Sequence, residues 1–221
     1  MSFKSALSHP WDVSIAEARR IQQELAQKVI LEDRFGTPSY VAGVDVGFEQ
    51  QGTITRAAIA VLSFPALQLV EQGIARIKTT FPYVPGYLSF RELPAVLEAL
   101  EKLTTRPDMF LCDGQGIAHP RAFGIACHLG LLTDTPSIGV AKSRLIGSYT
   151  EPGVHKGDWE YLQHDGRNIG VVLRTRSNVK PLFVSPGHRV SIPGAKDLVM
   201  ACVTRYRLPE TTRHAHKLAS G

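Results

Sequence analysis

The chain has 221 residues, 43% of them hydrophobic, and its 25 lysines and arginines against 20 acidic residues give a net charge of +5. This length predicts one compact domain over residues 1–221, and the small excess of positive charge permits a nucleic-acid partner without requiring one. The start, MSFKSALSHPWDVS, has no apolar signal core and no stretch is apolar enough to span a membrane, so we expect a cytoplasmic protein without membrane contact. The three cysteines are odd in number and widely spaced, which argues against a disulfide framework or a zinc site and predicts buried thiols: Cys112, Cys127 and Cys202.

The first predicted element is a helix over about residues 13–31, where apolar residues recur at helical spacing and Ser14 and Glu17 match a capping box. Three β-rich runs follow at residues 40–48, 54–64 and 67–79 and favour an antiparallel meander. After the proline-rich stretch FPYVPG, helical spacing returns at Val96, Leu97, Leu100 and Leu103.

The second half of the chain alternates between strand and helix patterns. Strands are predicted at 109–113, 137–141, 169–174 and 181–184, and helices at 121–132 and 192–205. The polar segment 147–168 is interpreted as a long loop, either facing the substrate or merely variable. A three-stranded antiparallel meander followed by βα units and flanked by helices predicts an α/β, ribonuclease H-like fold with a mixed sheet.

Two aspartates are candidates for a metal site. Asp45 interrupts the apolar run VAGVDVGF, where a buried carboxylate requires a divalent cation or, for a purely structural role, a buried Arg or Lys partner; a phosphate-binding hairpin is a weaker alternative. Asp113 ends the strand MFLCD, although an Asp before Gly114 is also a common turn residue. Paired carboxylates at strand ends suit Mg²⁺ or Mn²⁺, and phosphodiester hydrolysis uses such a site.

Three further residues have both a functional and an ordinary interpretation. Glu92 in SFRE completes a capping box with Ser89, or lies just outside a helix that begins at Pro94 and points elsewhere. Lys142, after the strand PSIGVA, is a solvated charge or holds a phosphate or the attacking water. His119 is an ordinary loop histidine or, beside a metal, contacts the leaving phosphate.

The segment PYVPG holds an aromatic side chain on a stiff backbone. Pro82 and Pro85 restrict the chain, so Tyr83 has little freedom left to lose on binding. A rigid aromatic suits insertion into a base stack, whereas the ordinary interpretation is that Tyr83 packs on the core and the prolines close a turn.

With these residues in place, the chain resembles the endonuclease V family closely, through long blocks in family order: VAGVDVGF, FPYVPGYLSFRELP, CDGQGIAHPRAFG, PSIGVAKSRLIG and YRLPETTRHAH. The resemblance implies a ribonuclease H-like DNA repair endonuclease that recognises deoxyinosine. Such an enzyme, with Mg²⁺ or with Mn²⁺ in its place, cuts the second phosphodiester bond 3′ to the lesion and leaves 3′-hydroxyl and 5′-phosphate ends. It also implies catalytic roles for Asp45, Glu92, Asp113, Lys142 and His119, a metal contact for His216, and a strand-separating wedge at Tyr83 with Pro82 and Pro85.

The resemblance further places Gly86, Leu88, Gly114 and Gly116 around a flipped base. A backbone N–H could donate to O6 of hypoxanthine, but in the same pocket it would face the amino group of adenine. The unpaired donors would weaken binding of adenine by about 1–3 kcal/mol. Gln115 departs from a frequent family pattern, in which histidine is common. Inosine-containing RNA or single strands are further candidate substrates, and no obligate protein partner is inferred. The alternatives are a related ribonuclease H-like nuclease with another specificity and a non-catalytic nucleic-acid-binding module.

Overall fold

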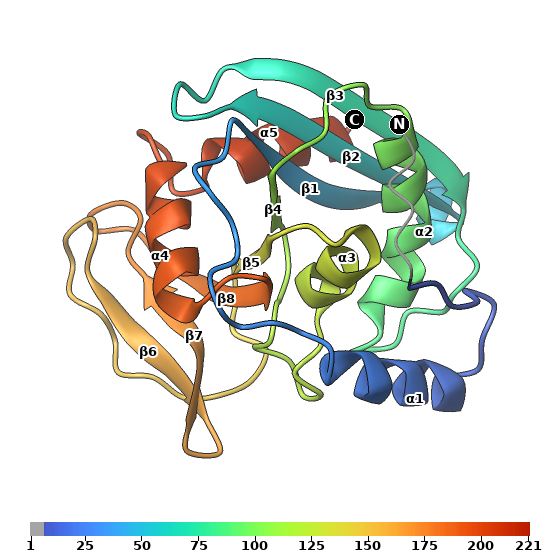
Figure 1. Cartoon of the computed structure of the whole chain (residues 1–221), viewed down its shortest axis with the longest axis horizontal. Helices are drawn as coiled ribbons and strands as arrows, with labels where there is room; N and C mark the ends of the chain where they lie inside the picture. The colour runs from blue at the N-terminus through green and yellow to red at the C-terminus, as the bar shows by residue number, and fades with distance from the viewer. Residues whose placement is uncertain (1–6) are drawn as a thin grey trace.

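The computed structural model describes residues 7–221, in which eight strands form a single mixed sheet with helices on both faces (Figure 1). Residues 1–6, part of the segment considered above for a signal sequence, lie outside the described residues. The strand order is β3-β2-β1-β4-β5-β8-β7-β6. Among residues 7–221, no helix is both long and apolar enough to cross a bilayer.

The predicted antiparallel meander is confirmed. Its strands pair in sequence order, and a short 3₁₀ turn connects the first two: β1 Tyr40–Glu49, η1 Gln50–Gly52, β2 Ile54–Ser63 and β3 Leu69–Lys78. On its other edge β1 pairs in parallel with β4, and β4 pairs in parallel with β5. The connections that lead to β4 and to β5 contain α2 and α3, respectively. The bounds of these elements are α2 Leu88–Glu101, β4 Met109–Cys112, α3 Ile125–Thr133 and β5 Ser137–Ala141.

The rest of the sheet is antiparallel. It continues from β5 through β8, β7 and β6, and two helices end the chain: β6 Trp159–His164, β7 Arg167–Leu173, β8 Leu182–His188, α4 Ile192–Ala201 and α5 Glu210–Ala219. Together with the meander, this arrangement confirms the predicted mixed α/β, ribonuclease H-like fold.

Alternation along the strands divides the core between the two faces of the sheet. In β1, Ala42 and Val44 pack with Val96 of α2 and Leu129 of α3. The opposite face of the sheet packs against α4 and α5, and Val41 belongs to that cluster. The three cysteines are free and buried, as predicted.

The buried apolar residues of helix α1, Ile15–Ala26, belong to a third hydrophobic cluster, apart from the two that cover the faces of the sheet. The predicted capping box of Ser14 and Glu17 is present, but the helix ends five residues earlier than predicted. Its apolar stripe of Ala18, Ile21 and Leu25 packs with aromatic residues within or next to α2 and α3: Phe81, Tyr87, Phe90 and Phe123. This position places α1 beside the segment PYVPG.

Several predicted boundaries were wrong. Helix α3 begins at Ile125 rather than at residue 121, since the preceding Ala122 has a positive φ of 49°. Strand β6 lies inside the segment predicted as a loop, and only Leu162 along it is buried, so the sequence shows no alternating pattern there. The predicted helix 192–205 ends at Ala201.

Candidate active site

Strand register brings the two aspartates together. Val44 of β1 lies opposite Cys112 of β4, and the N–H of Asp113 donates to the Val44 carbonyl at 2.9 Å. Because the strands are parallel, the residue that follows each of this pair, Asp45 and Asp113, lies at the same edge. Asp45 is only 8% exposed, so its carboxylate is held in a nearly dry environment.

Helix α5 adds a histidine to this pair because glycines let the helix lie directly on β1. A Cβ atom at Gly43 would overlap the backbone carbonyl of Thr211, and one at Gly47 would overlap the carbonyl of Ala219. This close packing places Nδ1 of His216 2.7 Å from Oδ2 of Asp45. Ligand atoms of Asp45, Asp113 and His216 lie within 4.8 Å of one another, which makes this cluster a candidate metal site.

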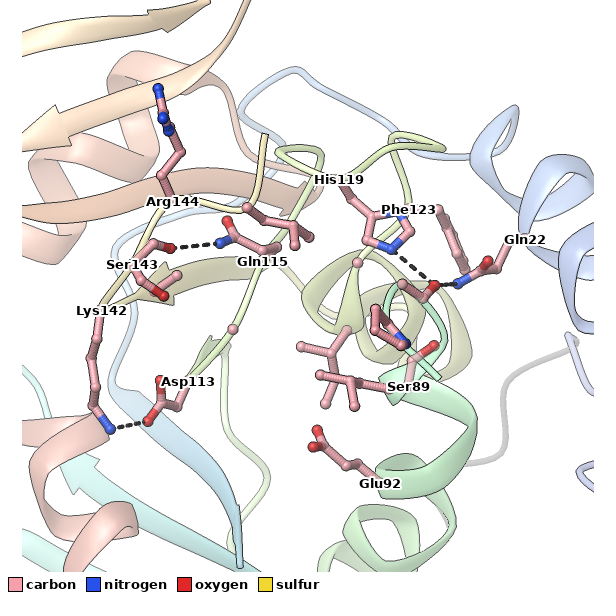
Figure 2. Close-up of a pocket in the computed structure, with 18 of the residues that line it drawn as sticks. Gln22, Ser89, Glu92, Asp113, Gln115, His119, Phe123, Lys142, Ser143 and Arg144 are labelled. Carbon is pink, nitrogen blue, oxygen red and sulfur yellow. Dashed lines mark hydrogen bonds and ion pairs between the residues drawn. The ribbon is translucent and has the colours of Figure 1, made fainter. Parts of the chain in front are cut away.

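Glu92 reaches the site from within a helix, which corrects both sequence interpretations. Helix α2 begins at Leu88 after Tyr87, which makes no side-chain cap, so Ser89 is not an N-cap and Pro94 does not start the helix. Ser89 instead donates its hydroxyl to Nδ1 of the buried His128 at 3.0 Å. Figure 2 shows the Glu92 carboxylate extending from α2 into a pocket that Asp113 also lines.

The acids of this cluster are poorly compensated by the protein itself. Burial, followed by the charge of Asp113, raises the pKa of Asp45, and the hydrogen bonds from His216 and the Val46 N–H oppose this rise. Burial and the charges of Asp45 and Asp113 raise the pKa of Glu92 to about 8. The hydrogen bonds to the Asp45 carboxylate come from the Val46 N–H and His216, and Lys142 acts on it through its charge, so the described residues give Asp45 no buried Arg or Lys in direct contact.

Lys142 brings a positive charge into direct contact with one of the acids, Asp113. Its Nζ lies 2.5 Å from Oδ2 of Asp113, at the end of β5, and the side chain remains partly exposed (Figure 2). The donor set of carboxylate oxygens and one imidazole, with negative charge left uncompensated, fits a hard divalent cation.

A cavity of about 370 Å³ extends from the acids to the PYVPG segment. Its lining includes Tyr83, Pro85, Gly86, Leu88 and Gly114, whereas Gly116 does not line it. The Gly116 N–H donates to Ser185 Oγ at 2.8 Å and a Cβ there would overlap the Pro186 carbonyl, so this glycine permits close packing on β8. Tyr83 is 69% exposed and so does not pack on the core, and Pro82 is also exposed.

Both ring nitrogens of His119 are occupied by the surrounding loops. The Arg121 N–H donates to Nδ1 at 3.2 Å, so Nε2 carries the proton and donates to the Gly86 carbonyl at 3.0 Å. Burial, with the charge of Arg121, lowers the pKa of His119 to about 4. A neutral histidine held in this way fixes the position of the pocket wall.

Other lining residues were missed from the sequence. Gln22 of α1 and Arg144 of the loop after β5 both line the cavity, and the Gln115 amide donates to the Ser143 carbonyl at 3.1 Å, joining two loops of its wall. Arg121, which contacts Gln22 and His119 behind the cavity wall, lies within the block CDGQGIAHPRAFG and could have been found there. Gln22 had no such signal, because only the fold brings α1 to the pocket.

Comparisons with known proteins agree with this geometry. A family model described as Endonuclease V matches residues 23–217. An endonuclease V of Trichormus variabilis is 61% identical over 213 residues, which cover 96% of each chain. The crystal structure of the Streptomyces avermitilis endonuclease V has a TM-score of 0.91 at 42% identity and covers 100% of this chain and 96% of that one.

A third relative has been solved with nucleic acid. Endonuclease V of Ciona intestinalis, in complex with a 23mer DNA containing an inosine followed by a ribo-adenosine, has a TM-score of 0.83 at 33% identity. That match covers 93% of this chain and 95% of that one. The resemblance found in the sequence is thereby confirmed, and the chain belongs to the endonuclease V family of metal-dependent nucleases.

Proposed function

We propose that this endonuclease acts in DNA repair, recognising deaminated bases, chiefly deoxyinosine, and hydrolysing the second phosphodiester bond 3′ to the lesion. The products would carry 3′-hydroxyl and 5′-phosphate ends. One observation carries the proposal: Asp113, which shares the candidate metal cluster with Asp45 and His216, lines the same cavity as Glu92 and Tyr83. The inosine-containing DNA bound by the Ciona intestinalis relative supports the choice of lesion.

Mg²⁺, with Mn²⁺ able to substitute, is the proposed metal. Asp45, Asp113, Glu92 and His216 would hold it, since their oxygen and imidazole donors suit a hard cation. When bound, such a cation lowers the pKa of a water nucleophile and neutralises charge that grows on the leaving oxygen. Glu92 must first give up the proton that its pKa of about 8 retains at neutral pH.

The protein's own groups orient the substrate around this centre. Lys142 fixes one oxygen of Asp113 and adds a positive charge where a substrate phosphate would approach. His119 stays neutral and holds the Gly86 carbonyl, and we assign it this positioning role rather than contact with the leaving phosphate. In this proposal Lys142 contacts the substrate phosphate, and His119 supports the pocket.

The exposed aromatic ring and the cavity behind it account for lesion selection. Tyr83, stiffened by Pro82 and Pro85, would fill the gap left by an extruded nucleotide. Gly86, Leu88 and Gly114 would surround the extruded base, and a backbone N–H that pairs with O6 of hypoxanthine would meet an amino group on adenine. Mispaired inosine unstacks more easily than a normal base, which widens this difference.

We further propose that the chain acts as one catalytic domain in the cytoplasm. One continuous eight-stranded sheet supports the first inference, and three buried free thiols suit a reducing compartment. Inosine-containing RNA and single strands remain candidate substrates, distinguished by tolerance of the 2′-hydroxyl.

The decisive experiment is a nicking assay on inosine-containing duplex DNA, with a matched RNA strand in parallel. We expect Mg²⁺ or Mn²⁺ to support a nick at the second bond 3′ to inosine and an adenine-containing duplex to remain intact. Asp45→Ala should lose cleavage while its thermal unfolding shows a folded protein. Cleavage by the wild type no faster than by Asp45→Ala, with either metal, would refute the proposal.

A further inference from the structure

The backbone carbonyl of Gly86 accepts three hydrogen bonds from three different side chains. Gln22 Nε2 donates from α1 at 3.0 Å and His119 Nε2 at 3.0 Å (Figure 2), and Arg121 Nη2 donates at 2.5 Å. Arg121 also donates from Nε to Oε1 of Gln22 at 2.6 Å, which fixes the orientation of that amide. A carbonyl oxygen has two lone pairs, so two donors would already satisfy it, and a third donor is more than it needs.

Gly86 is the residue at which the PYVPG segment turns back into the protein. Its φ is +81°, and a Cβ there would lie 2.8 Å from the Arg121 guanidinium, so the turn and the donor cluster fit each other closely. Phe81 and Tyr87, on either side of the segment, are buried against α1, while Tyr83 between them projects into solvent. The guanidinium of Arg121 also stacks over the Tyr87 ring, 4.2 Å from its centre.

Gln22 is the polar exception on the buried face of α1. The residue is 1% exposed, whereas the other buried positions of the helix are apolar or small: Ala18, Ile21 and Leu25. Burying a primary amide is unfavourable unless its groups are paired, and here both ends of the amide are paired, to Gly86 and to Arg121. The first helix therefore supplies a specific polar contact to the far end of the PYVPG segment.

We propose that Gln22 and Arg121 are positioning residues that clamp the Gly86 carbonyl and so hold Tyr83 ready to enter the base stack. The proposal rests on the proposed function, since it assigns a task within lesion recognition. A wedge must resist being pushed back when it opens a duplex, and a fixed carbonyl at its base supplies that resistance. On a single strand no paired stack has to be opened, so the clamp matters much less there.

This difference between substrates gives the test. Gln22→Ala removes both contacts of the amide, whereas Gln22→Glu keeps an acceptor for Arg121 and removes only the donor to Gly86. The matched control is Gln23→Ala, at the next position of the same helix, where the side chain is exposed. We expect kcat/KM on inosine duplex to fall about tenfold in both Gln22 variants, because both lose the hydrogen bond to Gly86, and about twofold or less on the single strand. The control should leave both rates unchanged.

A second measurement follows the backbone without using catalysis. Amide hydrogen exchange over residues 82–87, read by mass spectrometry, should become faster in Gln22→Ala and in Arg121→Met, while exchange in β1 stays unchanged. The double variant should be little worse than either single variant, because the two side chains form one unit.

Equal losses on duplex and single strand, or exchange over 82–87 as slow as in the wild type, would overturn the clamp and leave Gln22 a purely structural residue. A general loss of folding would also lower both substrate rates together, but it would speed exchange in β1 as well as over 82–87; a variant that shows this is set aside, and Gln22→Glu or Arg121→Met then decides. If the wild type cuts neither substrate, the proposed function fails, and the exchange measurement alone then decides whether the clamp holds the segment.

Discussion

Replacing Glu92 by glutamine should make the metal-free protein more stable at alkaline pH. The carboxyl group has a pKa of about 8 in the folded chain because it is half-buried next to Asp45 and Asp113, against an ordinary value of 4.5. The folded state therefore holds a proton that the unfolded chain releases more easily. By linkage, this group contributes stability that is lost as the pH rises from about 4.5 to about 8.

The size of the effect follows from that interval. At about 1.4 kcal/mol per pH unit, the full difference corresponds to about 5 kcal/mol above pH 8. Water and counter-ions that enter a half-buried site reduce the penalty, so we expect Glu92→Gln to gain about 2–5 kcal/mol at pH 8.5 in EDTA. At pH 4.5 the two proteins should have the same stability.

The measurement is the free energy of unfolding in urea, from pH 4.5 to 8.5, with EDTA and with Mg²⁺. Mg²⁺ should stabilise the wild type, by about 2.7 kcal/mol at a hundredfold excess over its Kd, and should stabilise Glu92→Gln less. Glu98→Gln, an exposed change on the same helix, is the control and should shift stability by under about 0.5 kcal/mol. If Glu92→Gln in EDTA at pH 8.5 is no more stable than the wild type, burial and the neighbouring carboxylates do not raise the pKa of Glu92 as described.

Three further predictions follow from the same contacts. Gly43→Ala should destabilise the protein by about 2–4 kcal/mol in urea unfolding and reduce cleavage, because the added Cβ overlaps the Thr211 carbonyl and displaces α5. The control is Gly36→Ala, where the added Cβ meets open space. The imidazole of His119 should titrate in NMR with a midpoint near 4, and a midpoint above 6 would contradict the neutral positioning role. Lys142→Met should lower kcat by about 10²–10³-fold with the fold retained, whereas Lys28→Met should not, and an unchanged kcat would remove Lys142 from the mechanism.

Asp45 and Asp113 could be predicted from the sequence because their local surroundings are unambiguous. Each carboxylate interrupts or ends a continuous apolar run, and parallel pairing of two such strands brings their ends to one edge. Glu92 could not be resolved in this way. Both the capping-box pattern and Pro94 suggested a later helix start, yet packing of Phe90 and Leu93 in the core extends the helix back to Leu88, which overrides both local signals.

Helix α5 was missed because its buried side is built from small and polar residues. The sequence of α5 has little hydrophobic periodicity, because its buried side includes Thr211, Thr212, Ala215 and Ala219. These small side chains matter because they let the helix pack closely against the glycines of β1. Strand β6 was missed for the related reason that an edge strand with one buried residue has no alternation to detect. Contacts of this kind depend on the partner surface, which a local pattern does not contain.

The two ends of the chain complete different parts of the site, and this separates its chemistry from its selectivity. His216 on α5 touches the carboxylate of Asp45, so loosening α5 should affect metal binding and hydrolysis. Gln22 on α1 touches the base of the PYVPG segment, so loosening α1 should affect opening of the duplex while the acids on β1 and β4 keep their register. The central sheet supplies the fixed frame for both, so we expect that each function can be weakened without the other.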